Sequence, residues 1–225
     1  MRLRYFAVLL AGAGLAYGAN DAASRLDASA DVLTEIMASP DKGIPQDLLD
    51  KSACIIVVPG LKKGAFIIGG KYGKGFISCR KDPGPGWSAP AAVRVEGGSF
   101  GLQIGGSETD VVMVLMNRGG VKKLLSSKFT LGADAHAAAG PVGRESSADT
   151  DAKLHAEILT YSRSRGLFAG ISLQGATLRP DDDWNKELYG SGVPNEDVVL
   201  GTTNPPASAS KLLAALNKFS GRRAG

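Results

Sequence analysis

Glycines interrupt the apolar segments of this chain so often that they limit what it can fold into. The chain has 30 glycines in 225 residues, about twice the usual share of roughly 7%. They follow no collagen-like period, and many lie inside apolar runs between residues 54 and 117, where glycine is typical of bulges, bends and tight hairpins. Frequent strand glycines suit a tightly curved sheet. We therefore expect a curved, mainly antiparallel, barrel-like β-sheet.

The apolar runs predict where the strands lie. Residues 53–58 are wholly apolar and rich in β-branched side chains, which is typical of a strand buried on both faces. Residues 66–71 and 75–79 are expected to form a hairpin whose turn is Tyr72-Gly73-Lys74. Further strands are expected at 87–95, 99–104, 110–116 and 167–173, and strand is favoured for the ambiguous segments 129–139 and 154–162.

Helical patterns flank this β-rich block. Residues 20–39 carry Leu26, Ala30, Leu33 and Met37 at helical spacing, and Pro40 follows the pattern. This predicts an N-terminal amphipathic helix. Shorter helices are expected from Pro45 and at 118–126, 181–188 and 211–219. The fold class is therefore α+β, with a few short helices packed at the ends and on one face of the sheet.

Cys54 and Cys79 are the only cysteines. In a simple three-strand meander they would lie about 9.6 Å apart, at opposite ends of their strands, whereas a disulfide requires Cα atoms within ~7 Å. A bond therefore requires the Cys54 strand to pair antiparallel with the Cys79 strand directly, which gives the spatial order second–third–first. We expect that arrangement, with two unrelated buried thiols as the alternative.

The first 19 residues have the pattern of a signal peptide. Arg2 and Arg4 precede an apolar stretch at 6–15, and small residues follow up to Ala19. The apolar stretch is shorter than the ~20 residues that span a bilayer. We expect an exported protein, periplasmic or secreted and peripheral at a membrane, in a compartment that permits disulfides. Residues 20–200 are expected to form a single domain, and 201–225 a linker with a short helix.

Motifs for catalysis and for metals fail on context. Gly97-Gly98-Ser99-Phe100-Gly101 matches the G-x-S-x-G elbow of hydrolases, but a β-like run follows where that elbow requires a helix. Two histidines and two cysteines without metal-like spacing predict no metal site. We therefore expect a non-enzymatic protein without a cofactor, and a serine hydrolase that uses Ser99 is the remote alternative.

Basic residues gather in the first half of the chain. Seven lie between residues 51 and 81 with no acid among them, whereas residues 134–200 hold eleven acids against six bases. Lysines at predicted loops could converge into a patch that attracts anionic surfaces, although an ordinary solvated face is the alternative. The absence of a stacking motif argues against nucleic acid. The candidate contacts are Lys62, Lys63, Lys71, Lys74, Arg80 and Lys81.

Several segments together carry a family resemblance. The glycine-rich block is followed in order by Ala139-Gly140-Pro141-Val142-Gly143-Arg144 and by Tyr161-Ser162-Arg163-Ser164-Arg165-Gly166-Leu167-Phe168-Ala169-Gly170. This succession resembles the SYLF domain over roughly residues 36–190. The resemblance implies a lipid-binding module, which in eukaryotes is joined to SH3 or FYVE domains and is linked to actin. It implies an anionic or phosphoinositide-like phospholipid as the partner.

The N-terminal helix departs from the family pattern. In SYLF proteins an N-terminal amphipathic helix is implicated in membrane contact, but this one carries four acids (Asp21, Asp27, Asp31 and Glu35) against Arg25 alone. Because an acidic face is repelled by anionic lipid, we expect its apolar side chains to pack on the domain. Actin would be met by an exported chain only in a host.

A second functional hypothesis is an envelope scaffold that acts through a protein partner. The C-terminal segment places four apolar side chains on one side of a short helix beyond a Thr/Asn/Pro/Ala/Ser linker. On this hypothesis the partner is contacted by Leu212, Leu213, Leu216 and Phe219.

Overall fold

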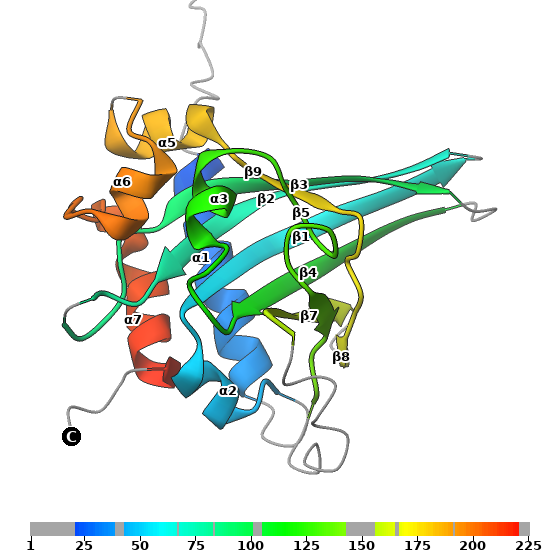
Figure 1. The fold of residues 1–225 in the computed structure, drawn as a ribbon, viewed down its shortest axis with the longest axis horizontal. Coiled ribbons are helices and arrows are strands. Elements are labelled where there is room, and N and C mark those ends of the chain that lie inside the picture. The colour runs from blue at the N-terminus through cyan, green and yellow to red at the C-terminus, as the bar shows by residue number, and fades with distance from the viewer. Residues whose placement is uncertain are drawn as a thin grey trace, which may run out of the picture.

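The fold is built around one nine-stranded sheet. The structure, a computed structural model, describes residues 21–38, 43–66, 68–82, 84–100, 105–142, 156–164, 167–190 and 192–220. Four long antiparallel strands form the centre of the sheet in the spatial order β3-β2-β1-β4 (Figure 1). These strands are β1 (Cys54–Phe66), β2 (Ile68–Cys79), β3 (Ala91–Phe100) and β4 (Gly105–Leu115). The signal-peptide prediction lies outside the described residues.

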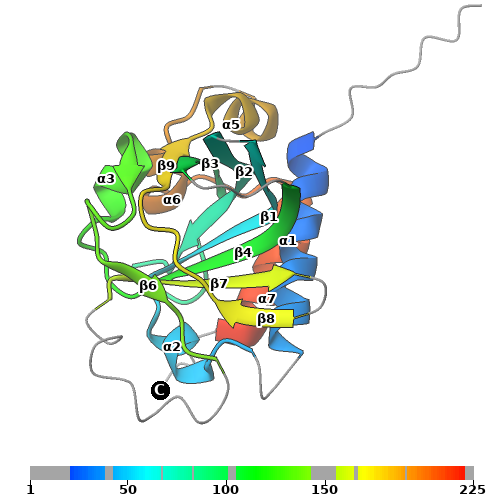
Figure 2. The same ribbon diagram turned by 90° about the vertical axis from the view of Figure 1, so that its right-hand side faces the viewer.

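Short strands extend the sheet at both sides. Beyond β3 lie β9 (Thr177–Pro180) and then β5 (Phe129–Thr130). Beyond β4 lie β7 (Ile158–Ser164) and then β6 (Ala137–Ala139), while β8 (Leu167–Gly170) also pairs with β7. Among the named strands, only the β6–β7 pair is parallel. Figure 2 shows the sheet curling around its interior, which confirms the predicted α+β fold with a curved, mainly antiparallel sheet.

Helices cover both faces of this sheet. On one face lie α1 (Asp21–Met37), α2 (Gln46–Lys51), α5 (Asp182–Tyr189) and α7 (Ser210–Ser220), the last preceded by the 3₁₀ turn η1 (Ala207–Ala209). On the other face lie α3 (Val121–Ser126) and α6 (Asn195–Leu200). Because strand side chains alternate, Ile55 and Val57 of β1 pack under the first group and Ile56 under the second. The strand predicted to be buried on both faces is therefore confirmed.

The N-terminal helix packs on the domain, as predicted. Leu26, Leu33 and Ile36 are buried against the sheet and α7, and Met37 is partly buried. The helices of the described segments include none that is both long and apolar enough to cross a membrane.

The C-terminal helix belongs to the same core. Leu212 and Leu216 of α7 are buried between this helix and α1, and Leu213 and Phe219 are partly buried against the same cluster. Leu212 and Leu216 are therefore not available to a protein partner, because α7 lies on α1 and uses its apolar face for packing, whereas Leu213 and Phe219 remain partly exposed.

The hairpin predicted at Tyr72-Gly73-Lys74 is also wrong. Strand β2 runs unbroken through this segment and pairs with β1 from Cys54 opposite Cys79 to Phe66 opposite Ile68. The two cysteine strands therefore pair directly, as a disulfide requires, and the sulfurs of Cys54 and Cys79 are bonded. The predicted order second–third–first does not occur, since there is no separate middle strand.

Gly73 and Gly75 of β2 allow the backbones of β1 and β2 to lie close together. A bulge in β1 shifts the register between Val58 and Leu61, where Gly60 has φ +60°. A Cβ at Gly75 would lie only 2.0 Å from the Val57 carbonyl oxygen. A Cβ at Gly73 would lie 2.9 Å from side-chain atoms of Val58 and Leu61. Because Gly73 and Gly75 have no side chains, β2 leaves room for the bulge in β1, and the two glycines do not form a turn.

Replacing Gly75 with alanine tests this account. We expect Gly75→Ala to lower the free energy of unfolding by about 3 kcal/mol, because the added methyl group overlaps backbone that cannot move without breaking strand pairing. Gly70→Ala is the matched control, since nothing lies within 4 Å of its Cβ position, and its effect should stay within about 1 kcal/mol. Urea unfolding measures both. Equal stability of the two variants would contradict the close contact.

Candidate functional site

The long strands β1–β4 project past the helices at one end of the molecule, called here the distal end (Figure 1). Four of the described side chains near this end are relevant to binding, and they lie on two neighbouring strands: Lys62 and Lys63 on β1, Lys71 and Tyr72 on β2. The distal end is therefore the place where the sequence-predicted lysines can act together.

Lys63 and Lys71 form a cross-strand pair. They are directly opposite each other in the β1–β2 register, so their Cβ atoms are about 5 Å apart on one face of the sheet. The residues next to them across the sheet are Ser107 on β4 and Gly97 on β3, neither of which is acidic. Partial burial, and then the charge of Lys71, lower the pKa of Lys63. Among the described residues, the row of this pair therefore holds two positive charges and no carboxylate.

Lys62 points to the opposite face and has a different environment. Its cross-strand neighbours are Tyr72 on β2 and Glu108 on β4, and Glu96 lies opposite Tyr72. Carboxylates therefore flank this row on both sides. The Tyr72 side chain is 48% exposed, so an aromatic ring with a polar tip faces solvent near the distal end.

The strand ends beyond the lysines are apolar in sequence. Strand β1 ends with Ala65 and Phe66, and β2 begins with Ile68. In the sheet Ile68 pairs with Phe66 on one side and with Phe100, the last residue of β3, on the other. Three adjacent strands therefore end in apolar residues about 10 Å beyond the Lys63–Lys71 pair, counted as three residues of strand.

Lys74 is held within the fold. Its Nζ lies 2.9 Å from Oδ2 of the buried Asp181 and 4.5 Å from the centre of the Trp184 ring. Asp181 also caps α5 by accepting a hydrogen bond from the Trp184 backbone N–H. Trp184 stacks on Phe76 of β2. Lys74 therefore links α5 to the sheet through its ion pair with Asp181, and it is not part of the distal end.

Arg80 and Lys81 lie at the other end of β2. The Arg80 guanidinium is buried, donates hydrogen bonds to the carbonyl oxygens of Leu49, Asp50 and Ser52, and stacks over the Trp87 ring. Lys81 is exposed and lies just beyond β2, and the strand from Lys71 to the end of β2 at Cys79 alone measures about 26 Å. The six predicted contacts therefore do not converge into one patch.

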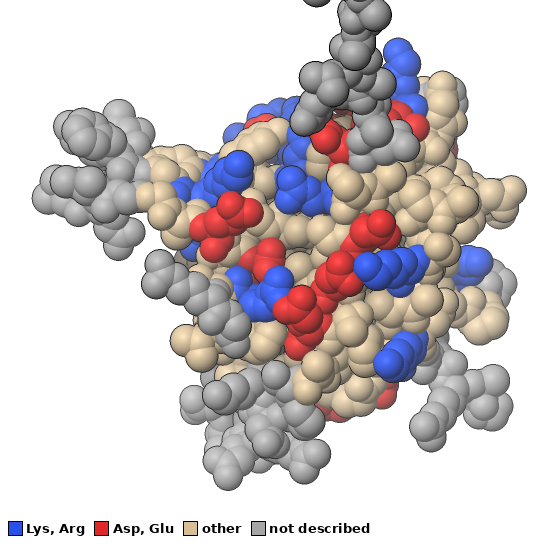
Figure 3. All heavy atoms as spheres, turned by 180° about the vertical axis from the view of Figure 1, so that it is seen from behind, with Lys and Arg blue, Asp and Glu red and all other residues tan. Residues whose placement is uncertain are grey.

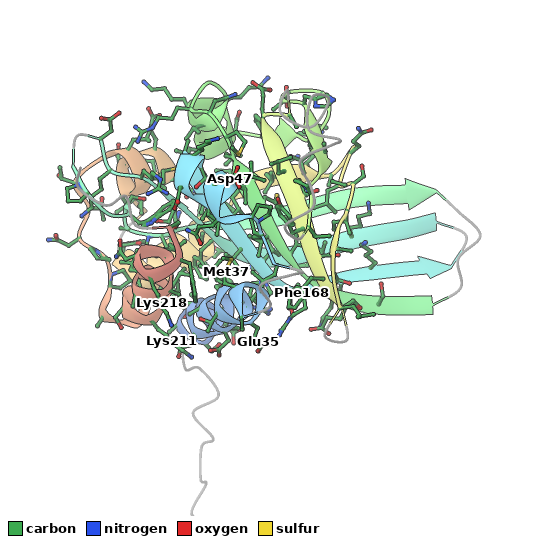
Figure 4. All side chains as sticks on the ribbon, turned by 90° about the horizontal axis from the view of Figure 1, so that it is seen from below. Glu35, Met37, Asp47, Phe168, Lys211 and Lys218 are labelled. Carbon is green, nitrogen blue, oxygen red and sulfur yellow. A yellow bond between two sulfur atoms is a disulfide. The ribbon has the colours of Figure 1, made fainter. Side chains whose placement is uncertain are left out.

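The acidic residues of α1 are exposed, and two of them, Asp31 and Glu35, make ion pairs. Figure 3 shows acidic side chains forming a band on one face of the molecule, with basic side chains beside it. Asp31 contacts Lys211 of α7 at 2.8 Å, and Glu35 contacts Arg163 of β7, which also binds Asp110 at 2.7 Å. Figure 4 shows Glu35 and Lys211 projecting from the two neighbouring helices. This face is mixed in charge rather than basic.

The catalytic and metal-binding alternatives have little geometric support. Ser99 lies within β3, opposite Gly69, and not at a turn from a strand into a helix as a hydrolase elbow requires. In the segments that the structure covers, no three histidine, cysteine, aspartate or glutamate side chains gather as a metal site would require.

The structural role of Lys74 predicts the effect of removing its partner. We expect Asp181→Ala to lower the free energy of unfolding by about 2–3 kcal/mol, because it removes both the helix cap and the ion pair. Asp181→Asn keeps an acceptor for the cap and should cost less. The neighbouring exposed Asp183 is the control, with an expected loss of about 0.5 kcal/mol on replacement by alanine. An Asp181→Ala protein as stable as this control would argue against the ion pair.

Comparison with known proteins points to one family. The model of the family described as "Ysc84: Las17-binding protein actin regulator" matches residues 96–219, more than half of the chain. The chain is 36% identical to an SH3 domain-containing protein of Schizosaccharomyces pombe, PJ696.02, over 77% of its own length and 41% of that protein. It is 33% identical to the human SH3 domain-containing YSC84-like protein 1, over 83% of the chain and 55% of the relative.

A third relative is LAS seventeen-binding protein 3 of Saccharomyces cerevisiae, 33% identical over 78% of the chain and 39% of the relative. The chain thus spans about half the length, or less, of these curated relatives. The relatives carry names of binding and SH3-containing proteins rather than of enzymes. The match to the family model and the agreement over most of the chain mean that this protein belongs to the Ysc84 family, whose domain is the SYLF domain that its sequence resembles.

Proposed function

We propose that this protein binds anionic phospholipid surfaces through the distal end of its sheet, without catalysing a reaction. The observation that carries the proposal is the cross-strand pair of Lys63 and Lys71, which has no carboxylate in its row and lies behind apolar strand ends. Like charges directly opposite each other destabilise a sheet. A phosphate group between them would relieve that repulsion.

The dimensions of the distal end fit a bilayer interface. Amphipathic protein surfaces bury their apolar parts about 5–10 Å into the boundary between headgroups and acyl chains. The apolar ends of β1 and β2 lie about 10 Å beyond Lys63 and Lys71. When the apolar ends reach this boundary, the two ammonium groups lie at the level of the phosphates. The exposed Tyr72 is a residue type enriched at the same level.

Charge reversal at the distal end tests the proposal. We expect the protein to sediment with vesicles of phosphatidylcholine and phosphatidylglycerol, and Lys63→Glu/Lys71→Glu to bind at least about tenfold more weakly, since each basic residue contributes about 1 kcal/mol near an anionic surface. Lys51→Glu/Lys81→Glu is the matched control, because both side chains are exposed and lie at the other end of the strands.

Three outcomes would contradict the proposal. They are equal binding to vesicles of phosphatidylcholine alone, unchanged binding by Lys63→Glu/Lys71→Glu, and an equal loss in the control variant. A protein partner is the second candidate function, and it is favoured by the description of the family as Las17-binding and by relatives that contain SH3 domains. Binding of a protein partner becomes the favoured function if the protein sediments with neither vesicle composition.

We further propose that the protein is exported to the cell envelope. The bond between Cys54 and Cys79 supports this, since structural disulfides persist in oxidising compartments. We expect protein isolated from its native cells under alkylating conditions to show no modifiable thiol until it is reduced, which intact-mass analysis measures. Two alkylated cysteines without prior reduction would contradict export.

A further inference from the structure

A pocket of about 360 Å³ lies where β3 and β9 meet the helices, and it shares no residue with the distal end. Arg94 of β3 and Arg179 of β9 line it from the sheet. Ser127 and Lys128, which follow α3, line it from another side, together with the beginnings of α5 and α6. Its volume lies within the range of about 300–1,000 Å³ that is usual for small-molecule sites.

The two arginines form a second like-charge pair across strands. Arg94 and Arg179 are directly opposite each other in the β3–β9 register, an arrangement that destabilises a sheet unless an anion offsets it. They share one carboxylate: Glu96 Oε1 lies 2.8 Å from Arg94 Nε, and Glu96 Oε2 lies 3.4 Å from Arg179 Nε. One negative charge therefore serves two guanidinium groups, and a positive charge remains.

Apart from the ion pair with Glu96, the two guanidinium groups have donors to spare, and both side chains are partly exposed, at 33% and 40%. Both Nε atoms are buried without a hydrogen-bond partner of suitable geometry, and neither guanidinium donates a hydrogen bond to any of the described residues. A guanidinium presents five donors in a planar fork that matches the oxygens of a phosphate. The exposed Lys128 brings a third cation to the pocket.

The pocket also contains acidic side chains, and these limit the choice of ligand. Asp182 and Glu196 line it, and Glu196 lies 3.7 Å from Lys122, outside the pocket. For Asp182 the described part of the chain offers no ion pair within 4.0 Å. A ligand with a phosphate at the arginines and a hydroxyl or amine group within reach of Asp182 would satisfy both parts of the pocket.

We propose that this pocket binds the phosphate of a small ester that also carries a hydroxyl or amine group. The chemistry is common to a phospholipid headgroup and to a free phosphate ester. The inference stands apart from the proposed membrane contact, because it rests on different residues and on binding that can be measured without a membrane.

Titration with soluble probes tests the site. We expect inorganic phosphate or phosphoethanolamine to bind the full chain saturably, as measured by calorimetry, and Arg94→Gln/Arg179→Gln to bind at least about tenfold more weakly, because each charge-assisted contact contributes that much or more. Lys51→Gln/Lys81→Gln is the control with the same change in net charge. Lys128→Gln, an exposed change that leaves the sheet untouched, should weaken binding several-fold and covers the case in which the double variant fails to fold.

Vesicle binding by the same variants distinguishes the two sources of phosphate. If Arg94→Gln/Arg179→Gln loses phosphoethanolamine but keeps vesicle binding, the site takes a free ester. If it also loses vesicle binding while the Lys51→Gln/Lys81→Gln control keeps it, the site takes a headgroup. The inference is overturned if both probes fail to bind saturably up to about 10 mM and vesicle binding is unchanged, or if the double variant binds like the control. The membrane proposal is tested independently by the Lys63→Glu/Lys71→Glu variant.

Discussion

The backbones of β1 and β2 are in close contact where the bulge at Gly60 shifts their register. The rest of the sheet depends on this contact. Because β2 has no side chain at Gly73 and Gly75, the two strands stay paired on both sides of the bulge. From α1, Arg25 reaches this point and donates a hydrogen bond to the Pro59 carbonyl oxygen. The helical layer is thereby fixed to the same feature that shapes the sheet.

Two functional arrangements follow from the register that this contact sets. On the side of the bulge away from the distal end, Cys54 lies opposite Cys79, which makes the disulfide sterically feasible. On the distal side, Lys63 lies opposite Lys71. A slip of one residue would turn each side chain to the other face of its strand, and both the lysine pair and the disulfide would be lost together.

Cations in this protein are held in three different ways. Arg80 is buried and satisfied by carbonyl oxygens, so it stabilises the packing of α2. A row of three cations crosses β2, β3 and β9 at Lys74, Arg94 and Arg179, where the first has its own buried carboxylate and the other two share one. The lysine pair at the distal end has none in its row. Charges that look alike in the sequence therefore differ in how far they are available to an anionic ligand.

The sequence by itself determined the class of the fold and most of its elements. The period of the apolar residues identified α1, the core of β1 and the C-terminal helix, because burial imposes that period directly. It missed β9 and α6, whose four and six residues show no clear period of apolar side chains. Only the tertiary structure decided how Gly73 and Gly75 are used, because a glycine that forms a turn and one that admits a neighbouring backbone look the same in sequence. It also decided which cations meet, since cross-strand neighbours such as Arg94 and Arg179 are far apart in the chain and their pairing depends on the register of the whole sheet.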